Sequence, residues 1–454
     1  MSRREQYKHL LNGTANWILY AIHTAIFGYI WYQIYVPELK DPFWNRGNWA
    51  VIGMYTLFVF FFSRIFGAYR IGYMRIVDIC TAQLLATFCA NFIAYFQVCM
   101  VANDYMQVTP ILAMMAVETA VIVPFVYAVR YTYVRLYPPR TMIVVYGRYS
   151  PDALIAKINT HKDKYHICAS ESYRIGYERL YPMLREYNSV LLCDLPSQAR
   201  NQIMKYCYQE GIRTYVTPKI SDLLLRGAED IHLFDTPLLV SRNQGLTVDQ
   251  RFFKRIEDIV ISLLGIILVS PLMLVIAAAI KLYDGGPVFY KQKRYTRDEE
   301  IFDILKFRSM SVHEESFEKT EITKKEDARV TPVGKIIRRT HLDELPQLFN
   351  ILKGEMSVVG PRAEWVNTTD RYVEQVPEFI FRLKVKAGLT GYAQVYGKYT
   401  TTPYDKVKLD ITYIQNYSLW LDIKLILLTV KILFDGEKTE GVDNAQKTAI
   451  REEK

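Results

Sequence analysis

Long apolar stretches follow one another in the first third of the chain. Four of them come close to the ~20 residues that a helix needs to cross the hydrocarbon core of a bilayer. They cover residues 17–36, 49–66, 79–101 and 111–129. Half of all residues are hydrophobic and 14% are aromatic, which also indicates membrane contact. The pattern predicts a membrane protein with a four-helix transmembrane bundle within residues 1–137.

Basic residues gather at alternate ends of these stretches. They precede the first stretch, separate the second from the third and follow the fourth: Arg3, Arg4, Lys8, Arg70, Arg75, Arg130, Arg135 and Arg140. Lysine and arginine collect in the cytoplasmic loops of membrane proteins. We therefore expect these positions, and the chain after residue 137, on the cytoplasmic face.

Glu118 is an ionisable residue within the fourth stretch, where a charge in lipid is costly. Asn91, Gln83 and Gln97 of the third stretch offer polar partners. We interpret Glu118 as a partner in an interhelix hydrogen bond and assign it no catalytic role.

Short apolar runs alternate with amphipathic segments in residues 138–248. The runs cover 142–146, 165–169, 189–193 and 214–216. This alternation predicts a cytoplasmic α/β domain with a parallel, Rossmann-like sheet. The first run ends at Gly147, but no GxGxxG motif follows it. We therefore expect a regulatory or oligomerising domain without a bound dinucleotide.

A fifth apolar stretch, residues 259–280, has basic residues on both sides. Arg251, Lys254 and Arg255 precede it, and Lys281, Lys291, Lys293 and Arg294 follow it. Both ends therefore favour the cytoplasm. Ser270 and Pro271 lie in the middle, where proline removes a backbone donor and kinks a helix. We expect a re-entrant membrane helix over 256–282 that breaks at these two residues; the alternative is a plain fifth spanning helix.

The run from Arg338 to Gln347 sets two adjacent carboxylates, Asp343 and Glu344, beside two arginines. The apolar residues that follow are spaced as one helix face, and Gly354 stands where that helix would end. We expect Asp343 at or near the N-cap, with Pro346 in the first turn. Because amides at a helix N-terminus favour an anion, the run predicts a site for phosphate chemistry.

Histidine and cysteine give no sign of a zinc site. The seven histidines form no HxxH or HxxxH pair, and the six cysteines have no metal-ligand spacing. We expect reduced thiols.

Motifs in the second half of the chain resemble those of a known family. They occur in order at residues 286–290 (GPVFY), 306–310 (KFRSM), 338–347 (RRTHLDELPQ), 353–357 (KGEMS), 360–362 (GPR), 388–391 (GLTG) and 418–422 (SLWLD). In these motifs the chain is similar to the bacterial sugar transferases known as polyprenyl-phosphate hexose-1-phosphate transferases, or large monotopic phosphoglycosyl transferases. The resemblance implies an α/β catalytic domain over residues 249–436 that includes the re-entrant helix.

That family moves a hexose-1-phosphate from a UDP-sugar to a polyprenyl phosphate such as undecaprenyl phosphate and releases UMP, through a covalent phosphosugar–enzyme intermediate. The resemblance implies that Asp343 is the nucleophile and that Glu344, together with Asp343, holds Mg²⁺. The chemistry permits both roles, because a carboxylate can attack phosphorus and Mg²⁺ prefers one or two carboxylates plus phosphate oxygens. It also implies exopolysaccharide or capsule synthesis at the bacterial cytoplasmic (inner) membrane, contact with membrane lipid, a homodimer, and no nucleic-acid partner.

Further site residues are implied by the same resemblance. Arg338 and Arg362 fit bidentate clamps on phosphoryl oxygens, and Lys306 and Arg308 are further candidates for phosphate contacts. Asp410 and Asp422 match acidic positions of the family without an assigned role. His341 stands where the family often has a small polar residue, and we interpret it as structural rather than as a general base.

The end of the chain is apolar but interrupted by charges over residues 419–434. This composition favours a helix that lies in the membrane interface or packs on the re-entrant helix. Residues 437–454 form a polar tail without a predicted fold.

Two other classes remain open. A membrane-anchored nucleotide-sugar dehydratase or epimerase would pair spans with an α/β domain, and Tyr404 to Lys408 spell YxxxK. A non-catalytic membrane scaffold would also explain an anchor plus a domain, although it does not need the Asp343–Glu344 pair. The sequence leaves the hexose open between glucose, galactose and an acetamido sugar.

Overall fold

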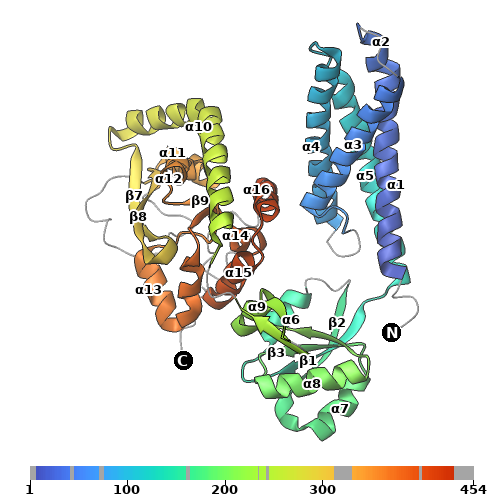
Figure 1. The fold of residues 1–454 in the computed structure, drawn as a ribbon, viewed down its shortest axis with the longest axis vertical. Coiled ribbons are helices and arrows are strands. Elements are labelled where there is room, and N and C mark those ends of the chain that lie inside the picture. Colours follow the sequence, from blue (N-terminus) through green and yellow to red (C-terminus); the bar gives the residue numbers. More distant parts are fainter. Residues whose placement is uncertain are drawn as a thin grey trace. The chain divides into compact units, whose positions relative to one another are not determined.

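The computed structural model describes most of the chain as two compact units (Figure 1). The described residues are 7–40, 45–70, 76–159, 164–233, 235–241, 245–310, 330–397 and 401–433. The first unit is Met1–Thr217 and the second is Pro218–Lys454. The predicted polar tail, 437–454, and the basic residues Arg3, Arg4 and Arg75 lie outside the described residues.

Long helices open the first unit. They are α1 (Lys8–Ile30), which continues through a π-helical turn η2 (Trp31–Tyr35) into α2 (Val36–Glu38), then α3 (Asn45–Phe66), α4 (Ile76–Ala102) and α5 (Thr109–Leu136). Among the described helices, α3, α4, α5 and α10 of the second unit are long and apolar enough to cross a membrane. The first expected span, 17–36, is divided between α1, η2 and α2 and stays a prediction.

Glu118 of α5 is fully buried and bonds to side chains of the three other long helices of this unit. Its carboxylate accepts hydrogen bonds from Asn91 Nδ2 at 2.6 Å and from Tyr55 Oη at 2.7 Å, and His23 Nδ1 lies 2.7 Å away. The interhelix hydrogen bond predicted from Asn91 is confirmed. The two glutamines of α4 donate to backbone carbonyls instead, and the sequence did not indicate His23 or Tyr55.

A four-stranded parallel sheet follows in the same unit. Its strands are β1 (Arg140–Tyr146), β2 (Tyr165–Ser172), β3 (Ser189–Cys193) and β4 (Arg213–Val216), in the order β2-β1-β3-β4. The connecting helices are α6 (Asp152–Asn159), the short η3 (Tyr173–Ile175) with α7 (Tyr177–Arg185), and α8 (Ser197–Gln209). The predicted parallel α/β sheet, with its strand positions, is confirmed.

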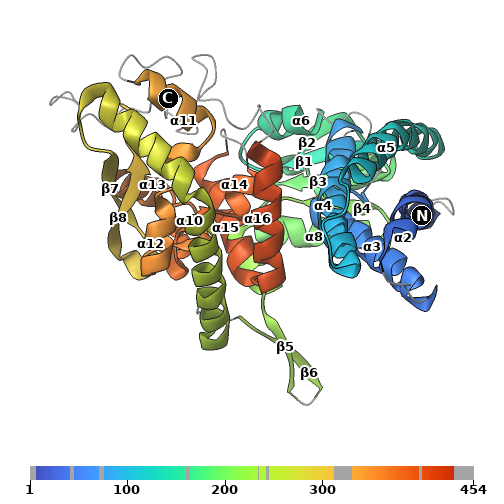
Figure 2. The same ribbon diagram turned by 90° about the horizontal axis from the view of Figure 1, so that it is seen from above.

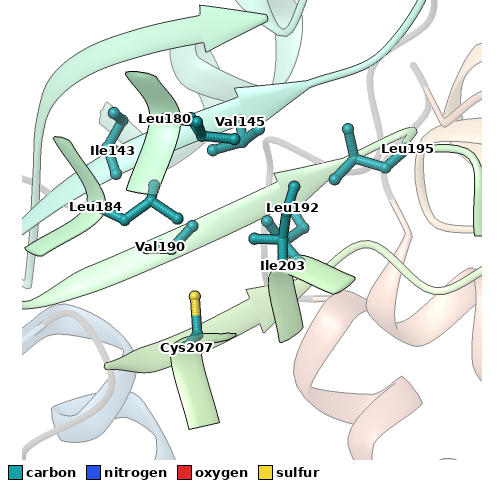
Figure 3. Packing of buried hydrophobic residues seen from close by; sticks show 9 residues of the cluster. All are labelled: Ile143, Val145, Leu180, Leu184, Val190, Leu192, Leu195, Ile203 and Cys207. Atoms are coloured by element: carbon teal, nitrogen blue, oxygen red, sulfur yellow. The ribbon is translucent and has the colours of Figure 1, made fainter. Parts of the chain in front are cut away.

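Apolar side chains cover both faces of this sheet, as expected for parallel strands between helices. Ile143 and Val145 of β1 lie with Leu180 and Leu184 of α7 in one core cluster (Figure 3). The alternate positions of β1 pack on the opposite face against α6. Gly147 directly follows β1. Only glycine fits at this position, because a Cβ would lie 2.0 Å from the backbone oxygen of Asp194.

The second unit combines helices with three small two-stranded sheets. Its elements are α9 (Ile220–Arg226), β5 (Glu229–Leu233), β6 (Thr236–Val240), α10 (Val248–Asp284), β7 (Phe289–Tyr295), η4 (Arg297–Glu299), β8 (Ile301–Phe307), α11 (Pro332–Arg339), η6 (Leu342–Glu344), α12 (Gln347–Lys353), β9 (Ser357–Val359), α13 (Val366–Gln375), η7 (Pro377–Lys384), β10 (Gly388–Thr390), α14 (Tyr392–Tyr396), α15 (Pro403–Gln415) and α16 (Leu419–Leu433). β5–β6 and β7–β8 pair antiparallel, and β9–β10 pair parallel.

Helix α10 is the longest element of the second unit. A capping box of Thr247 and Gln250 starts it, and Gly285 ends it in the left-handed conformation with φ 69°. Figures 1 and 2 show two straight segments that meet at a sharp bend, and Pro271 lies inside the helix. A proline at this place removes a backbone hydrogen bond and accounts for a bend.

One face of α10 packs on the rest of the second unit, and the opposite face is apolar and exposed. In the first half, Lys254 Nζ donates to Asp422 Oδ2 of α16 at 2.5 Å, and Asp258 accepts from Ser357 Oγ at 2.8 Å. In the second half, apolar residues pack against Phe307 and other residues of the unit. The exposed face includes Leu263, Leu264, Ile267, Leu268, Leu274, Val275 and Leu282. Both halves of α10 are therefore fastened to the same folded unit.

Candidate active site

Glu344 lies at the centre of the candidate site, between two basic side chains. Lys306 Nζ, at the end of β8, donates to Glu344 Oε1 at 2.7 Å. Arg362 Nη2, from the loop after β9, donates to the same oxygen at 3.0 Å. The Glu344 side chain is only 13% exposed. The structure thus brings together the acidic pair and two of the four basic residues that the sequence nominated for phosphate binding.

A tight turn between two short helices presents the acidic pair. Thr331 caps α11 by accepting from the Gly334 amide at 2.9 Å, and after this helix His341 adopts the left-handed conformation with φ 54°. This conformation is uncommon for a residue with a side chain. It turns the chain into the single 3-10 turn η6, which holds Asp343 and Glu344.

The expected capping position was wrong by three residues. Asp343 lies in η6, and Pro346 is the N-cap residue of α12. The reason is that proline lacks the amide of a helix interior, so the regular helix begins only after it. The predicted end is confirmed: Gly354 follows α12 with φ 93°.

Helix α12 is held from two sides, which fixes η6 in front of it. The Asn350 side chain accepts from the Leu305 amide of β8 at 3.0 Å and donates to the Asp303 carbonyl at 2.9 Å. Arg255 of α10 donates to the carbonyls of Ile351 and Leu352, each at 2.7 Å. The two bonds from Arg255 satisfy carbonyls that the end of a helix leaves without partners.

The two carboxylates have opposite pKa shifts. Burial would raise the pKa of Glu344, but the charges of Arg362 and Lys306 outweigh it and hold that pKa well below its usual range. Burial raises the pKa of Asp343, the positive charge of Lys306 acts against the shift, and the Glu344 carboxylate adds to it. Glu344 is therefore the ionised carboxylate of the site, and Asp343 beside it is the more basic of the two.

Arg294 of β7 lies in the same hollow, and sequence reasoning gave it no site role. The hollow is lined by Arg294, Lys306, Glu344, Gln347 and Arg362 among others. Arg294 Nη1 donates to the Ala363 carbonyl at 3.1 Å, next to Arg362. The pairing of β7 with β8 and a β-bridge from Arg294 to Trp365 bring it here, and a single sequence carries no signal of either contact.

Arg338 and Arg308 have other surroundings than Lys306 and Arg362. Arg338 is in the last turn of α11, and its charge acts on Asp343 in the direction that lowers the pKa of the carboxyl. Arg308 pairs with Asp284 at the end of α10, and its side chain is only 8% exposed. The structure shows neither arginine bonded to the acidic pair.

Asp410 and Asp422 have buried partners of their own. Arg382 Nε donates to Asp410 Oδ2 at 2.9 Å, and Asp422 accepts from Lys254 and from Tyr413 Oη, the latter at 2.9 Å. Both aspartates are almost fully buried. The structure does not bring either one to Glu344; it gives both the surroundings of ion pairs that join helices.

Tyr404 and Lys408 interact locally on α15. The Lys408 ammonium lies 4.3 Å from the centre of the Tyr404 ring, as in a cation–π contact. This pair belongs to the second unit, whereas the parallel sheet belongs to the first.

Comparison with known proteins identifies the class of the second unit. The family model described as "Bacterial sugar transferase" matches residues 249–436. A UDP-glucose:undecaprenyl-phosphate glucose-1-phosphate transferase of Caulobacter vibrioides is 41% identical over 207 residues, which cover 44% of this chain and 76% of that protein. The chain belongs to the bacterial sugar transferase family.

Two further relatives differ in the sugar that their names give. A UDP-glucose:undecaprenyl-phosphate glucose-1-phosphate transferase of Klebsiella pneumoniae is 39% identical over 266 residues, which cover 58% of this chain and 55% of that protein. A UDP-N-acetylgalactosamine-undecaprenyl-phosphate N-acetylgalactosaminephosphotransferase of Aeromonas hydrophila is 41% identical over 188 residues, 41% of this chain and 44% of that protein. The chain spans about half the length of most curated relatives that it matches.

Proposed function

We propose that the protein transfers a hexose-1-phosphate from a UDP-sugar to undecaprenyl phosphate and releases UMP, as the first membrane step of exopolysaccharide or capsule synthesis. The observation that carries the proposal is the contact of Glu344 with Lys306 and Arg362, beside Asp343, within the matched family region. Named relatives carry out this class of transfer with glucose or N-acetylgalactosamine.

The chemistry has two displacements at one phosphorus. An oxygen of Asp343 attacks the phosphorus that carries the sugar; the bond to the bridging oxygen breaks, and UMP leaves with that oxygen. An oxygen of undecaprenyl phosphate then attacks the same phosphorus, and the bond to Asp343 breaks, which restores the carboxylate. No proton has to move, so a general base is not required.

The surroundings of the acidic pair suit these roles. A carboxylate with a raised pKa is a better nucleophile when it is ionised, and burial raises the pKa of Asp343. The nearby Lys306 ammonium favours the ionised form of Asp343. Lys306 and Arg362 are placed to bind phosphoryl oxygens on which charge collects during transfer.

Magnesium fits the donor set of the site. Among the described residues, no group of three or more His, Cys, Asp and Glu side chains gathers, so the acidic pair supplies at most two protein ligands. Mg²⁺ takes one or two carboxylates and completes its shell with substrate phosphates and water. We propose Glu344 and Asp343 as these ligands; the ion would supply charge to the diphosphate.

The proposed membrane arrangement places the second unit on the cytoplasmic face of the bacterial inner membrane, with α10 as a re-entrant helix. Two features support it. Both halves of α10 contact one folded unit, and its opposite face is apolar and exposed. A helix that crossed the bilayer would separate its ends by the ~30 Å hydrocarbon core and could not keep both on the same unit at one surface.

The proposal includes a role for the first unit. We interpret its parallel sheet as Rossmann-like and propose that it serves a homodimer or its regulation rather than the chemistry. Mass determination of the protein in lipid nanodiscs tests this: a mass of one chain would contradict the dimer.

The direct test uses the full-length protein in detergent or nanodiscs. It is incubated with Mg²⁺, undecaprenyl phosphate and, in turn, UDP-glucose, UDP-galactose, UDP-N-acetylglucosamine and UDP-N-acetylgalactosamine. Release of UMP that depends on the lipid supports the proposal and identifies the sugar. Loss of water from the UDP-sugar would indicate a dehydratase, its conversion to an epimer would indicate an epimerase, and no reaction with any sugar would indicate a scaffold.

A further inference from the structure

The end of α10 and the end of β8 are joined by a small polar cluster. Asp284, the last residue of α10, accepts a hydrogen bond from Arg308 Nη2 and, on the same oxygen, one from the Gly286 amide at 3.2 Å. Lys281 Nζ donates to the Gly285 carbonyl at 2.7 Å. We name Lys281, Asp284, Gly286 and Arg308 the exit clamp, because they lie where the chain leaves α10.

Gly286 is required for this arrangement. A Cβ on Gly286 would lie 2.1 Å from Arg308 Nη1, which is closer than any real contact. Arg308 itself is 8% exposed, and its Nη1 has no hydrogen-bond partner among the described residues. The guanidinium therefore packs directly on the glycine backbone. The contact joins the GPVFY and KFRSM segments: Gly286 packs on Arg308, and the Arg308 amide donates to the Val288 carbonyl at 2.9 Å.

The acidic pair has supports of its own besides the exit clamp. Lys306 is positioned by the pairing of β8 with β7, and its neighbour Leu305 is bonded to Asn350. Arg255, in the first half of α10, holds the far end of α12. The second half of α10 also packs against Leu342 and Leu345, on either side of the pair. Loss of the clamp removes none of these contacts directly.

The clamp fixes the second half of α10 in position. Met273, Ile276 and Ile280 pack against Phe307 and Ile337, but apolar packing is not directional and sets no fixed position along the helix. A charge-assisted bond between an arginine fork and a carboxylate is directional. It therefore determines where the exposed apolar face of this half lies relative to Lys306.

We propose that Asp284 and Arg308 are positioning residues that set the place at which the lipid substrate meets Asp343, and that Arg308 is not a phosphate ligand. The inference rests on the proposed function, because it concerns the second displacement. A lipid bound along α10 reaches the site only from the side that this helix offers. The UDP-sugar comes from solution, so the first displacement does not need the clamp.

The test separates the two displacements in the full-length protein. Exchange of labelled UMP into UDP-sugar without lipid reports the first, and the KM for undecaprenyl phosphate in the complete reaction reports the second. For Asp284→Asn and Arg308→Gln we expect the lipid KM to rise about tenfold, which corresponds to about 1.4 kcal/mol. UMP exchange should stay within about twofold, because neither side chain is bonded to Asp343 or Glu344 and the variants remove no contact of the first displacement.

Two variants serve as controls. Arg308→Lys keeps the charge without the planar fork, and we expect it to recover part of the lipid KM. Asp298→Asn removes a carboxylate that pairs with Arg297 at an exposed position of the same unit, and it should leave both measurements unchanged. An equal loss of UMP exchange and lipid use in Arg308→Gln would overturn the inference, as would no change in either.

A measurement without substrate distinguishes this inference from the proposed function. Hydrogen exchange of backbone amides 273–288 should be faster in Arg308→Gln than in the unaltered protein, and unchanged in Asp298→Asn. Equal exchange would overturn the clamp even in an active enzyme. Absence of UMP exchange in the unaltered protein would instead contradict the proposed function, and hydrogen exchange would still decide whether the clamp holds the helix.

Discussion

Lys306 Nζ lies 2.7 Å from Glu344 Oε1, which joins two residues 38 positions apart. The contact connects the end of β8 with the turn η6 and places a positive charge beside the acidic pair. Arg362 completes it from a third segment. Because the partners come from separate parts of the sequence, the site exists only when the β7–β8 hairpin, η6 and the loop after β9 have assembled.

Asp343→Asn should remove the nucleophile and little else. The amide has the same shape but cannot form the acyl phosphate, so we expect UMP release to fall at least about a thousandfold. A labelled phosphosugar adduct on the protein, seen by intact-mass measurement after rapid quenching, should vanish as well. Asp298→Asn is the matched control. Rapid turnover by Asp343→Asn would contradict the proposed mechanism.

Lys306→Met should lower kcat/KM for the UDP-sugar by about a hundredfold or more, the usual effect of losing a group that stabilises transition-state charge. The substitution keeps most of the volume but removes the charge next to Glu344. Lys293→Met, at an exposed position of β7, is the control and should be neutral. Similar rates for the two variants would show that Lys306 does not act in the reaction.

Lys406→Gln should make the protein less stable in acid. Burial would raise the pKa of Glu364, but Lys406 and then Arg382 outweigh it and lower the pKa to about 2. A lowered pKa contributes stability that is present above the ordinary pKa and is lost as the pH falls through the lowered value. Without Lys406 the pKa of Glu364 rises and the stabilisation shrinks.

The measurement for Lys406→Gln is an acid titration of tryptophan fluorescence between about pH 6 and pH 2, where the carboxyl protonates. The unfolding midpoint should move to higher pH. Lys408→Gln, on the same helix but over the Tyr404 ring, is the control. Equal midpoints for Lys406→Gln and the unaltered protein would show that the Lys406–Glu364 contact adds nothing.

Glu118→Leu should destabilise the helices of the first unit. It leaves the Asn91 amide buried without its acceptor, whereas the Tyr55 hydroxyl keeps Asn91 Oδ1, and an unsatisfied buried donor costs about 1–3 kcal/mol. Glu118→Gln keeps one acceptor oxygen and should cost less. Thermal unfolding in detergent measures both. A melting temperature for Glu118→Leu equal to that of the unaltered protein would contradict the importance of the cluster.

Two cysteine variants test the course of α10. Val248→Cys, at the start of α10, and Lys291→Cys, in β7 just after its end, replace exposed residues, in a Cys168→Ser background that removes an exposed native thiol. A membrane-impermeant maleimide should label both in inside-out vesicles and neither in right-side-out vesicles. Labelling of the two positions from opposite sides would show that α10 spans the membrane.

The sequence was most informative where one local pattern suffices. The strands of the parallel sheet were predicted almost residue by residue, because each is an apolar run flanked by turn residues; the central strands β1 and β3 are also buried on both faces. Proline and glycine likewise marked the bend of α10 and the end of α12. The exact cap of α12 was missed because Pro346 separates the helix from the 3-10 turn η6, and no local pattern in the sequence marks that turn.

Contacts between distant segments were less accessible to sequence reasoning. Asp343, Glu344, Lys306 and Arg362 were nominated by motif resemblance, and the structure brings them together. The same resemblance nominated Arg308, Asp410 and Asp422, whose buried partners could not be guessed: Asp284, Arg382 and Lys254 lie 24, 28 and 168 positions away. The sequence position of a charged residue does not reveal whether it pairs with the substrate or with a residue of another helix.

The exposed apolar face of α10 has a practical consequence. Its opposite face is part of the folded core that surrounds Asp343 and Glu344. Removing α10 would therefore also unfold the candidate active site. A shortened chain that starts at Pro218 should still sediment with membranes, and in plain buffer its uncovered leucines and isoleucines should drive aggregation. Deleting the bundle is therefore not a route to a water-soluble catalyst.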